Sequence, residues 1–171
     1  MATKLKRITV KLPWLEGELV ADEAQQRAAW EMYVELVTRV AVQPLGPDEG
    51  LLREALLSLY ALFDETRRIL RQYGPEVAIP ERKKLLSFGQ LAVHVLNRGL
   101  RPFLAKWHPL LHAWEGTRLA GLSVRDHERA WEREPELRTA LEETRNQLRS
   151  YADILADLCG VAPLHDQERG D

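Results

Sequence analysis

The segment DEGLLREALLSLYALFDETRRILRQY, residues 48–73, is the clearest helix pattern in the sequence. Its apolar residues recur at spacings of three and four, which places them on one face of an α-helix. This face consists of Leu52, Leu56, Leu59, Phe63, Ile69, Leu70 and Tyr73. Gly74 and Pro75 follow directly, and glycine followed by proline is a common signal for a helix end. The sequence therefore predicts a long amphipathic helix over 48–73.

Similar apolar stripes lie on both sides of this helix and predict three more, over residues 22–41, 80–115 and 123–160. Capping residues, Asp22 and Ser123, stand at the start of two of them. Proline breaks or kinks a helix because it lacks the backbone N–H, and prolines interrupt the last two helices at Pro102, Pro109 and Pro135. The pattern favours an all-α fold, an antiparallel four-helix bundle with kinked third and fourth helices.

The N-terminus has a different pattern from the rest of the chain. Residues 5–12, LKRITVKL, alternate between apolar and polar side chains, which indicates an extended segment. No second strand is predicted for it to pair with, so it either lies along the bundle or adds to a partner. We therefore predict a short extended N-terminal arm over 1–20, a helical domain over 21–162 and a polar tail over 163–171.

The composition excludes several classes of protein. The chain has 171 residues, of which 45% are hydrophobic and 29% charged, with a formal net charge of −2, so it is not of the disordered type. The single cysteine, Cys159, rules out an intramolecular disulfide. No uncharged run reaches the roughly 20 residues of a membrane span, and the N-terminus lacks the apolar segment of a secretory signal. A cytoplasmic location is the expectation.

One face of the predicted third helix carries basic side chains. Residues 82–114 contain no Asp or Glu, whereas residues 126–157 are rich in both. At 100° per residue, basic residues and Ala105 share a sector opposite the apolar stripe; the basic members are His94, Arg98, Arg101, His108 and His112. Three interpretations stay open: a solvated face, a groove paired with the acidic fourth helix, and a site for an acidic partner or anion.

Trp14 is the other candidate contact residue, because it follows the arm and tryptophan often carries interface energy. The candidate partner- or anion-binding residues are thus Arg98, Arg101, His94, His108, His112 and Trp14. No catalytic residue and no cofactor are predicted. Cys159 is expected to be unreactive, because the negative end of a helix dipole raises the pKa of a thiol.

A metal site is the sharper alternative for the same face. His108 and His112 are four residues apart, the spacing at which two imidazoles can share a zinc ion. Glu115 or His127 would have to supply a third ligand, and the glutamate of the HExxH motif is missing. No metal is therefore predicted, although a ligand- or metal-binding bundle that uses these histidines stays an alternative.

Three segments, RGLRPFLAKWHPLLHAWE (98–115), HERAWE (127–132) and YADILADLCGV (151–161), resemble an uncharacterised family of small bacterial all-helical proteins. The resemblance implies a bacterial, cytoplasmic and helical protein, with no activity or cofactor attached.

The first functional hypothesis is a non-enzymatic protein–protein interaction or regulatory module that binds another protein or a second copy of itself. The alternatives are a small ligand- or metal-binding bundle, possibly an enzyme, that uses the His/Arg face, and a membrane-active bundle. Neither nucleic acid nor a membrane is the expected partner. The sequence leaves open whether the chain is an adaptor, a toxin or an antitoxin.

Overall fold

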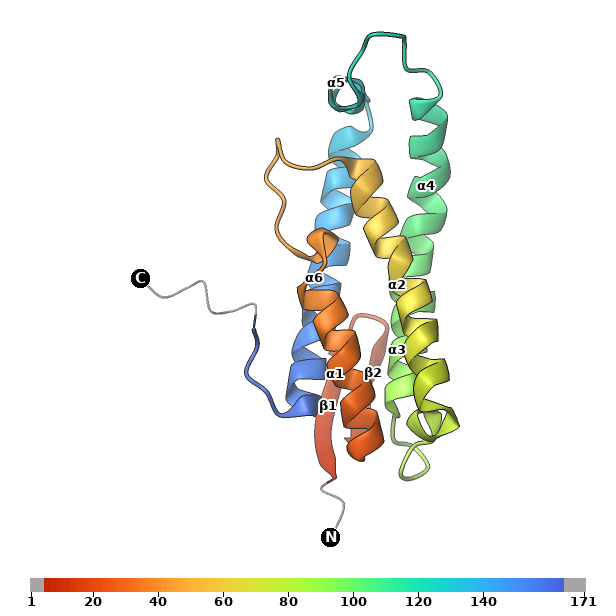
Figure 1. The fold of residues 1–171 in the computed structure, drawn as a ribbon, viewed down its shortest axis with the longest axis vertical. Coiled ribbons are helices and arrows are strands. Elements are labelled where there is room, and N and C mark those ends of the chain that lie inside the picture. Colours follow the sequence, from red (N-terminus) through yellow and green to blue (C-terminus); the bar gives the residue numbers. More distant parts are fainter. Residues whose placement is uncertain (1–4, 165–171) are drawn as a thin grey trace, which may run out of the picture.

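The computed structural model describes residues 5–164, and the chain is mostly helical (65%). Its helices are α1 (Glu23–Val37), α2 (Leu52–Tyr73), α3 (Phe88–His94), α4 (Arg101–Glu115), α5 (Val124–Arg129) and α6 (Glu134–Cys159). Two short 3₁₀ turns are η1 (Val40–Val42) and η2 (Pro75–Ala78), and the π-helical turn η3 (Val95–Leu100) joins α3 to α4. The long helices lie side by side along one axis, and α5 lies at one end of the molecule (Figure 1). Every helix among the described residues is too short or too polar to span a bilayer.

The predicted all-α fold, a four-helix bundle with an extended arm, is wrong. Residues 5–164 form five helices when α3, η3 and α4 are counted as one continuous helix, and a two-stranded antiparallel sheet precedes them. The strands are β1 (Lys6–Leu12) and β2 (Leu15–Ala21), and Leu12 lies opposite Leu15. The extended segment therefore pairs with the residues that directly follow it, across the two-residue turn Pro13–Trp14.

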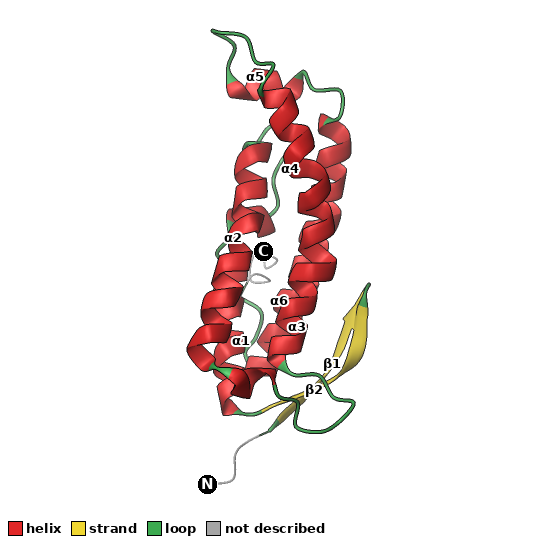
Figure 2. Cartoon of the chain, turned by 90° about the vertical axis from the view of Figure 1, so that its right-hand side faces the viewer, coloured by secondary structure: helices red, strands yellow, loops and turns green. Residues whose placement is uncertain are grey.

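Trp14 docks this hairpin onto the helices. Its Nε1 donates a hydrogen bond to Oε1 of Gln147 on α6 (3.3 Å), and Arg98 on η3 donates to its carbonyl oxygen (3.2 Å). A Cβ atom at Gly99 would lie 3.0 Å from the indole ring, so the glycine makes room for the side chain. Figure 2 shows the hairpin beside α3 and α6, and β1 packs on α6. Trp14 is thus half-buried within the chain, not an exposed anchor.

The predicted third helix starts later than expected and changes its pitch. It begins at Phe88, because Ser87 and Gln90 form a capping box there. Farther along, Pro102 has no N–H for the carbonyl of Arg98, and a widened turn accommodates it. Within that turn Arg101 N–H bonds to the carbonyl of Leu96, five residues back. Because this turn holds one residue more than a regular α-helical turn, residues before and after it no longer lie on the same face at the spacing of 100° per residue.

The predicted fourth helix consists of two separate helices, not one kinked helix. Ser123 caps α5, since its side chain accepts a hydrogen bond from the backbone N–H of Asp126 (3.0 Å). Pro135 lies in the first turn of α6, where its missing N–H has no consequence. Gly160 ends α6 in the left-handed conformation (φ 70°). Of the predicted polar tail, residues 165–171 lie outside the described part of the chain.

Two buried charged residues hold the start of α2 and the turn η1, which precedes it. Glu128 on α5 is 3% exposed and accepts hydrogen bonds from the backbone N–H groups of Leu52 (3.0 Å) and Arg53 (3.3 Å). This carboxylate caps α2, whose own preceding residue, Leu51, has no capping side chain. The helix accordingly begins at Leu52, later than the predicted position 48. On α6, the 2% exposed Arg145 donates to the carbonyl of Ala41 in η1 (3.2 Å).

Candidate functional site

A groove of about 470 Å³ lies between α2 and α4. Its lining is mainly apolar, and it consists of Leu57, Tyr60, Phe63, Arg67, Arg101, Leu104, Ala105, His108 and Pro109. Leu57 and Tyr60 are 52% and 54% exposed, although most large apolar side chains of α2 are buried. Adjacent exposed apolar side chains that line a concavity are typical of a binding surface.

Two arginines border the apolar part of this groove. The guanidinium carbons of Arg101 and Arg67 lie 5.3 and 5.8 Å from the centre of the Phe63 ring. Arg67 forms an ion pair with Asp64 (2.7 Å), whereas Arg101 donates to the neutral Asn97 side chain. Among the described residues Arg101 has no carboxylate partner, so this border of the groove keeps a positive charge.

His108 lines the groove, and one of its ring nitrogens is a buried hydrogen-bond donor. Its Nδ1 lies 2.7 Å from Nη1 of Arg53. Because a guanidinium only donates, Nδ1 must accept and the ring proton must reside on Nε2. That Nε2 is buried and has no hydrogen-bond partner among residues 5–164. A buried donor without an acceptor is costly, and because water does not reach this nitrogen, a ligand in the groove does not reach it either unless the neighbouring side chains move.

Arg53 holds His108 in this orientation. Its Nε and Nη2 donate to the two carboxylate oxygens of Glu115 (2.9 and 2.8 Å), a bidentate pair that fixes the guanidinium plane. The His108 ring also contacts Tyr60 edge-on, with ring centroids 5.7 Å apart. The donor is therefore held by a pair of rigid helices and not by a loop.

The environment of His108 predicts a pH dependence of stability. Burial, followed by the charge of Arg53, lowers the pKa of His108 below its usual 6.5, and Glu115 opposes this effect only in part. The folded-state pKa is thus lower than that of the unfolded chain. The contribution of neutral His108 to the free energy of unfolding is then fully present above about pH 6.5. It is lost as the pH falls below this value and through the lower pKa of the folded state.

We therefore expect urea unfolding between pH 7.5 and 5 to show a smaller loss of stability for His108→Gln than for the native chain. NMR titration of the His108 ring gives the direct measurement. An imidazole that titrates above 6.5 would contradict this assignment.

The residues weighed for a metal do not converge. Nδ1 of His108 faces Arg53, and the His112 side chain is 87% exposed. His127 stacks on Trp114 (ring centroids 4.5 Å apart), and its Nε2 lies 2.8 Å from the Trp114 carbonyl oxygen. No group of three or more His, Cys, Asp or Glu side chains in residues 5–164 could hold a metal ion.

The structure divides the predicted basic face. Arg101 and His108 line the groove, Arg98 contacts the hairpin, His94 is half-buried and His112 points to solvent. The π-helical turn separates Arg98 from Arg101. Among the described residues, Lys106 on α4 forms an ion pair with Glu136 on α6 (2.9 Å). No arginine of the predicted basic face pairs with an acidic residue of α6 in this part of the chain, so the predicted groove paired with the acidic helix is not formed.

Sequence reasoning missed the α2 wall of the groove, because it treated α2 as having one apolar face. Leu57 and Tyr60 lie beside that face and make α2 apolar over a wider arc than the core needs. This excess of apolar residues is a signal in the sequence that could have found them.

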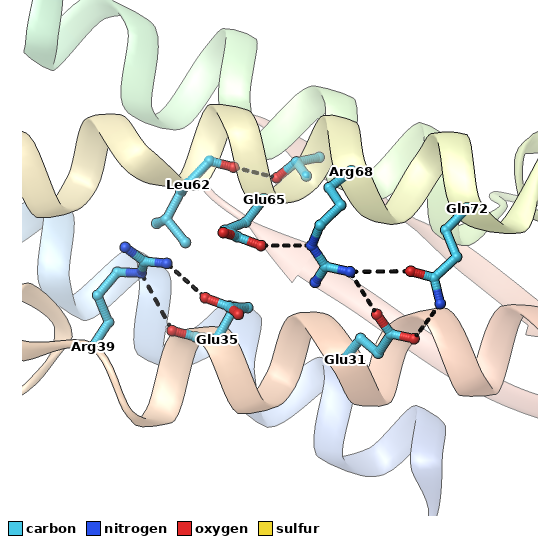
Figure 3. A network of polar contacts seen from close by, with 8 residues as sticks. Glu31, Glu35, Arg39, Leu62, Glu65, Arg68 and Gln72 are labelled. Atoms are coloured by element: carbon cyan, nitrogen blue, oxygen red, sulfur yellow. Dashed lines mark hydrogen bonds and ion pairs between the residues drawn. The ribbon is translucent and has the colours of Figure 1, made fainter.

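A second polar cluster joins α1 to α2 and is already saturated (Figure 3). Arg68 contacts Glu31 (3.2 Å) and Glu65 (2.9 Å), and Gln72 donates to Glu31 (3.0 Å). The hydrogen bonds to these carboxylates raise the pKa of Arg68. Such exposed, mutually paired groups stabilise a helix interface slightly and leave little free for a ligand.

Cys159 is not a candidate nucleophile. Burial raises the pKa of its thiol to about 11. The predicted direction is confirmed, and the cause is the removal of the thiol from water.

Comparison of the chain with models of known protein families, with curated proteins and with solved structures gave no match in any of the three. The resemblance of residues 98–115, 127–132 and 151–161 to a bacterial helical family stays a prediction. The groove is therefore interpreted from its own chemistry.

Proposed function

We propose that the protein is a non-enzymatic interaction module whose α2–α4 groove binds a helix of a partner protein. The observation that supports this function is the open apolar wall formed by Leu57 and Tyr60 between two long helices. Binding of an amphipathic helix in such a groove is a recurring mode of peptide recognition. The helices that form the walls are packed on the core, so the groove is preformed and binding orders little of this chain.

The groove is expected to bind a designed amphipathic helix. We choose a blocked peptide of about 18 residues, or five turns, with leucines on one face and glutamates flanking them. Introducing two charges with Leu57→Glu and Tyr60→Glu should weaken binding at least about tenfold, because the peptide's leucines would then contact charge. Isothermal titration calorimetry measures this change.

Leu119→Glu combined with Leu122→Glu is the matched control, since it also adds two charges. Leu119 and Leu122 are 75% and 37% exposed and lie outside the groove, in the connection between α4 and α5. Equal losses in the control and in the groove variant would contradict docking at this site.

A small apolar anion is the second candidate ligand. A volume of about 470 Å³ falls within the range of roughly 300–1,000 Å³ that is common for small-molecule sites. Anilinonaphthalene sulfonate combines apolar rings with one negative charge and is a suitable probe. Binding of the probe is followed by its fluorescence. Saturable binding that is lost in the variant with Leu57→Glu and Tyr60→Glu, and that the peptide does not compete with, would favour this candidate over a helix.

The other hypotheses gain no support from the groove. A bacterial origin, a cytoplasmic location, self-association and membrane activity stay predictions. In the described structure the apolar face of α4 is buried, as Phe103, Trp107 and Leu111 show, so binding to a lipid surface would require the helices to separate.

A further inference from the structure

We infer that the outer edge of β1 binds an acidic, extended segment of a partner protein, which becomes a third strand of the sheet. This edge is separate from the α2–α4 groove, so the inference does not depend on the proposed function. It gives a role to the N-terminal hairpin, which takes no part in the groove.

The register of the hairpin determines which backbone groups lie at this edge. Leu12 and Leu15 flank a two-residue turn and therefore form a hydrogen-bonded pair. Hydrogen-bonded and non-hydrogen-bonded pairs alternate along an antiparallel ladder, so Arg7, Thr9 and Lys11 belong to non-hydrogen-bonded pairs. Their N–H and C=O groups thus point away from β2, to the outer edge of β1.

The opposite edge of the sheet agrees with this register and is already occupied. Glu18 lies opposite Thr9, so its carbonyl group should point away from β1. This carbonyl accepts a hydrogen bond from the backbone N–H of Leu86 (2.7 Å), which precedes α3. β2 lies on the side of α3 and β1 on the side of α6 (Figure 1). Because Leu86 occupies the middle of the β2 edge, β1 is the edge left for a further strand.

The β1 edge is open in the described part of the chain. Within residues 5–164, no backbone group of Arg7, Thr9 or Lys11 has a hydrogen-bond partner outside the hairpin. These three residues are exposed, whereas the alternate residues Val10 and Leu12 are buried. An open strand edge is a template for another strand, and addition of a peptide strand is a recurring mode of recognition.

The charge of β1 specifies the partner. The strand carries three basic residues, Lys6, Arg7 and Lys11, and no acidic one. Arg7 pairs with Glu18 of β2 (2.9 Å), whereas Lys11 has no ion pair within residues 5–164. Basic side chains at an edge hinder indiscriminate strand pairing, and opposite charges on neighbouring strands stabilise it. The edge therefore favours a strand that carries carboxylates.

The same charges disfavour a second copy of the chain at this edge. Antiparallel pairing of two β1 strands about Thr9 would place each Arg7 opposite Lys11 of the other copy. Like charges directly opposite each other in a sheet are destabilising. The expected occupant is thus a different, acidic protein segment.

The spacing of the basic residues gives the pattern of that segment. Arg7 and Lys11 are four residues apart on one face of β1, or about 13 Å along the strand. A strand added in either direction has its residues i and i+4 opposite them. The segment should therefore carry Glu or Asp at i and i+4.

Two blocked, threonine-rich peptides of about nine residues test the charge preference. Such peptides favour the extended state and are too short for a stable helix. One carries Glu and the other Gln at i and i+4, and NMR titration of the labelled full chain measures both affinities. The Glu peptide should bind about fivefold more tightly, because it gains two cross-strand ion pairs.

Amide hydrogen exchange distinguishes strand addition from binding to the basic side chains alone. The N–H groups of Arg7, Thr9 and Lys11 should exchange more slowly when the Glu peptide is bound, because they gain acceptors. Those of Ile8 and Val10 already face β2, so their exchange should change little. Binding through side-chain charge would not produce this alternation.

Thr9→Pro blocks the edge without removing a hydrogen bond to β2, because only an outward N–H is lost. It should weaken binding of the Glu peptide at least about tenfold. Thr9→Val keeps this N–H and is the matched control, which should bind like the native chain. Lys11→Gln leaves the backbone unchanged and should reduce the preference for the Glu peptide from about fivefold to about twofold.

The outcomes are independent of the α2–α4 groove, so Leu57→Glu with Tyr60→Glu should leave binding of the Glu peptide unchanged. Equal affinity for the two peptides, no binding of either, or binding that Thr9→Pro does not weaken would overturn the inference. A dimer of the native chain in sedimentation, dissociated by Thr9→Pro, would also overturn it, because a second copy would then occupy the edge.

Discussion

Glu128→Ala is expected to destabilise the protein by about 2–3 kcal/mol. The substitution removes the acceptor for the backbone N–H groups of Leu52 and Arg53, which begin α2 in a buried position. These donors would be left without partners, and the first turn of α2, which leads directly to Arg53 and the His108 donor, would fray. Urea unfolding followed by circular dichroism measures the loss.

Two further variants show whether this loss comes from capping. Glu128→Gln keeps one oxygen acceptor and should cost about half as much as alanine. The neighbouring Glu132 is exposed, so Glu132→Ala should change the stability by less than about 0.5 kcal/mol. A similar cost for Glu128→Ala and Glu132→Ala would show that the carboxylate does not cap α2.

Trp14→Ala is expected to cost about 2–3 kcal/mol, from the apolar area that the indole buries between η3 and α6 and from the cavity left behind. The damage should be greatest at the hairpin, because Trp14 packs against the outside of the core and is not one of its fully buried side chains. Hydrogen exchange of β1 and β2 amides should accelerate strongly, while amides of α2 keep their protection.

The contact between Trp14 and the π-helical turn η3 can also be tested from the side of the turn. Gly99→Ala places a Cβ atom 3.0 Å from the indole and should loosen the hairpin in the native chain. Combined with Trp14→Ala, it should cost far less, because the space is then free. Additive costs would contradict direct packing of the tryptophan on Gly99.

Local signals in the sequence located much of the helical structure. The end of α2 at Gly74 follows from glycine and proline, and the starts of α1 and α5 follow from Asp22 and Ser123. Each of these features depends on side chains within four residues of the helix end. Such short-range physics can be recognised without knowing what packs where.

The hairpin could not be predicted, because its local signals are weak and the contacts that stabilise it come from residues distant in sequence. The middle of β2, Glu16–Gly17–Glu18, has low strand propensity, and the turn Pro13–Trp14 lacks the Asn-Gly or Asp-Gly signal of a tight hairpin. What stabilises it is tertiary packing: Leu86 covers Gly17, and its N–H bonds to the carbonyl of Glu18 (2.7 Å).

The candidate site was predicted only in part, for a similar reason. The helical phase of residues 101–115 correctly places Arg101 and His108 on one face of α4. The π-helical turn before Pro102 breaks this phase, so Arg98 points to the hairpin instead. The start of α2 likewise depends on Glu128, 76 residues away, and no local pattern indicates that contact.

The most direct measurement of the central claim is an amide NMR titration of the isotopically labelled protein with the designed amphipathic helix. Docking in the groove predicts amide shift changes concentrated in residues 57–67 of α2 and 101–109 of α4. Amides of the hairpin and of α6 should change little. Shift changes centred on the hairpin, or on the connection that carries Leu119, would contradict the groove as the binding site.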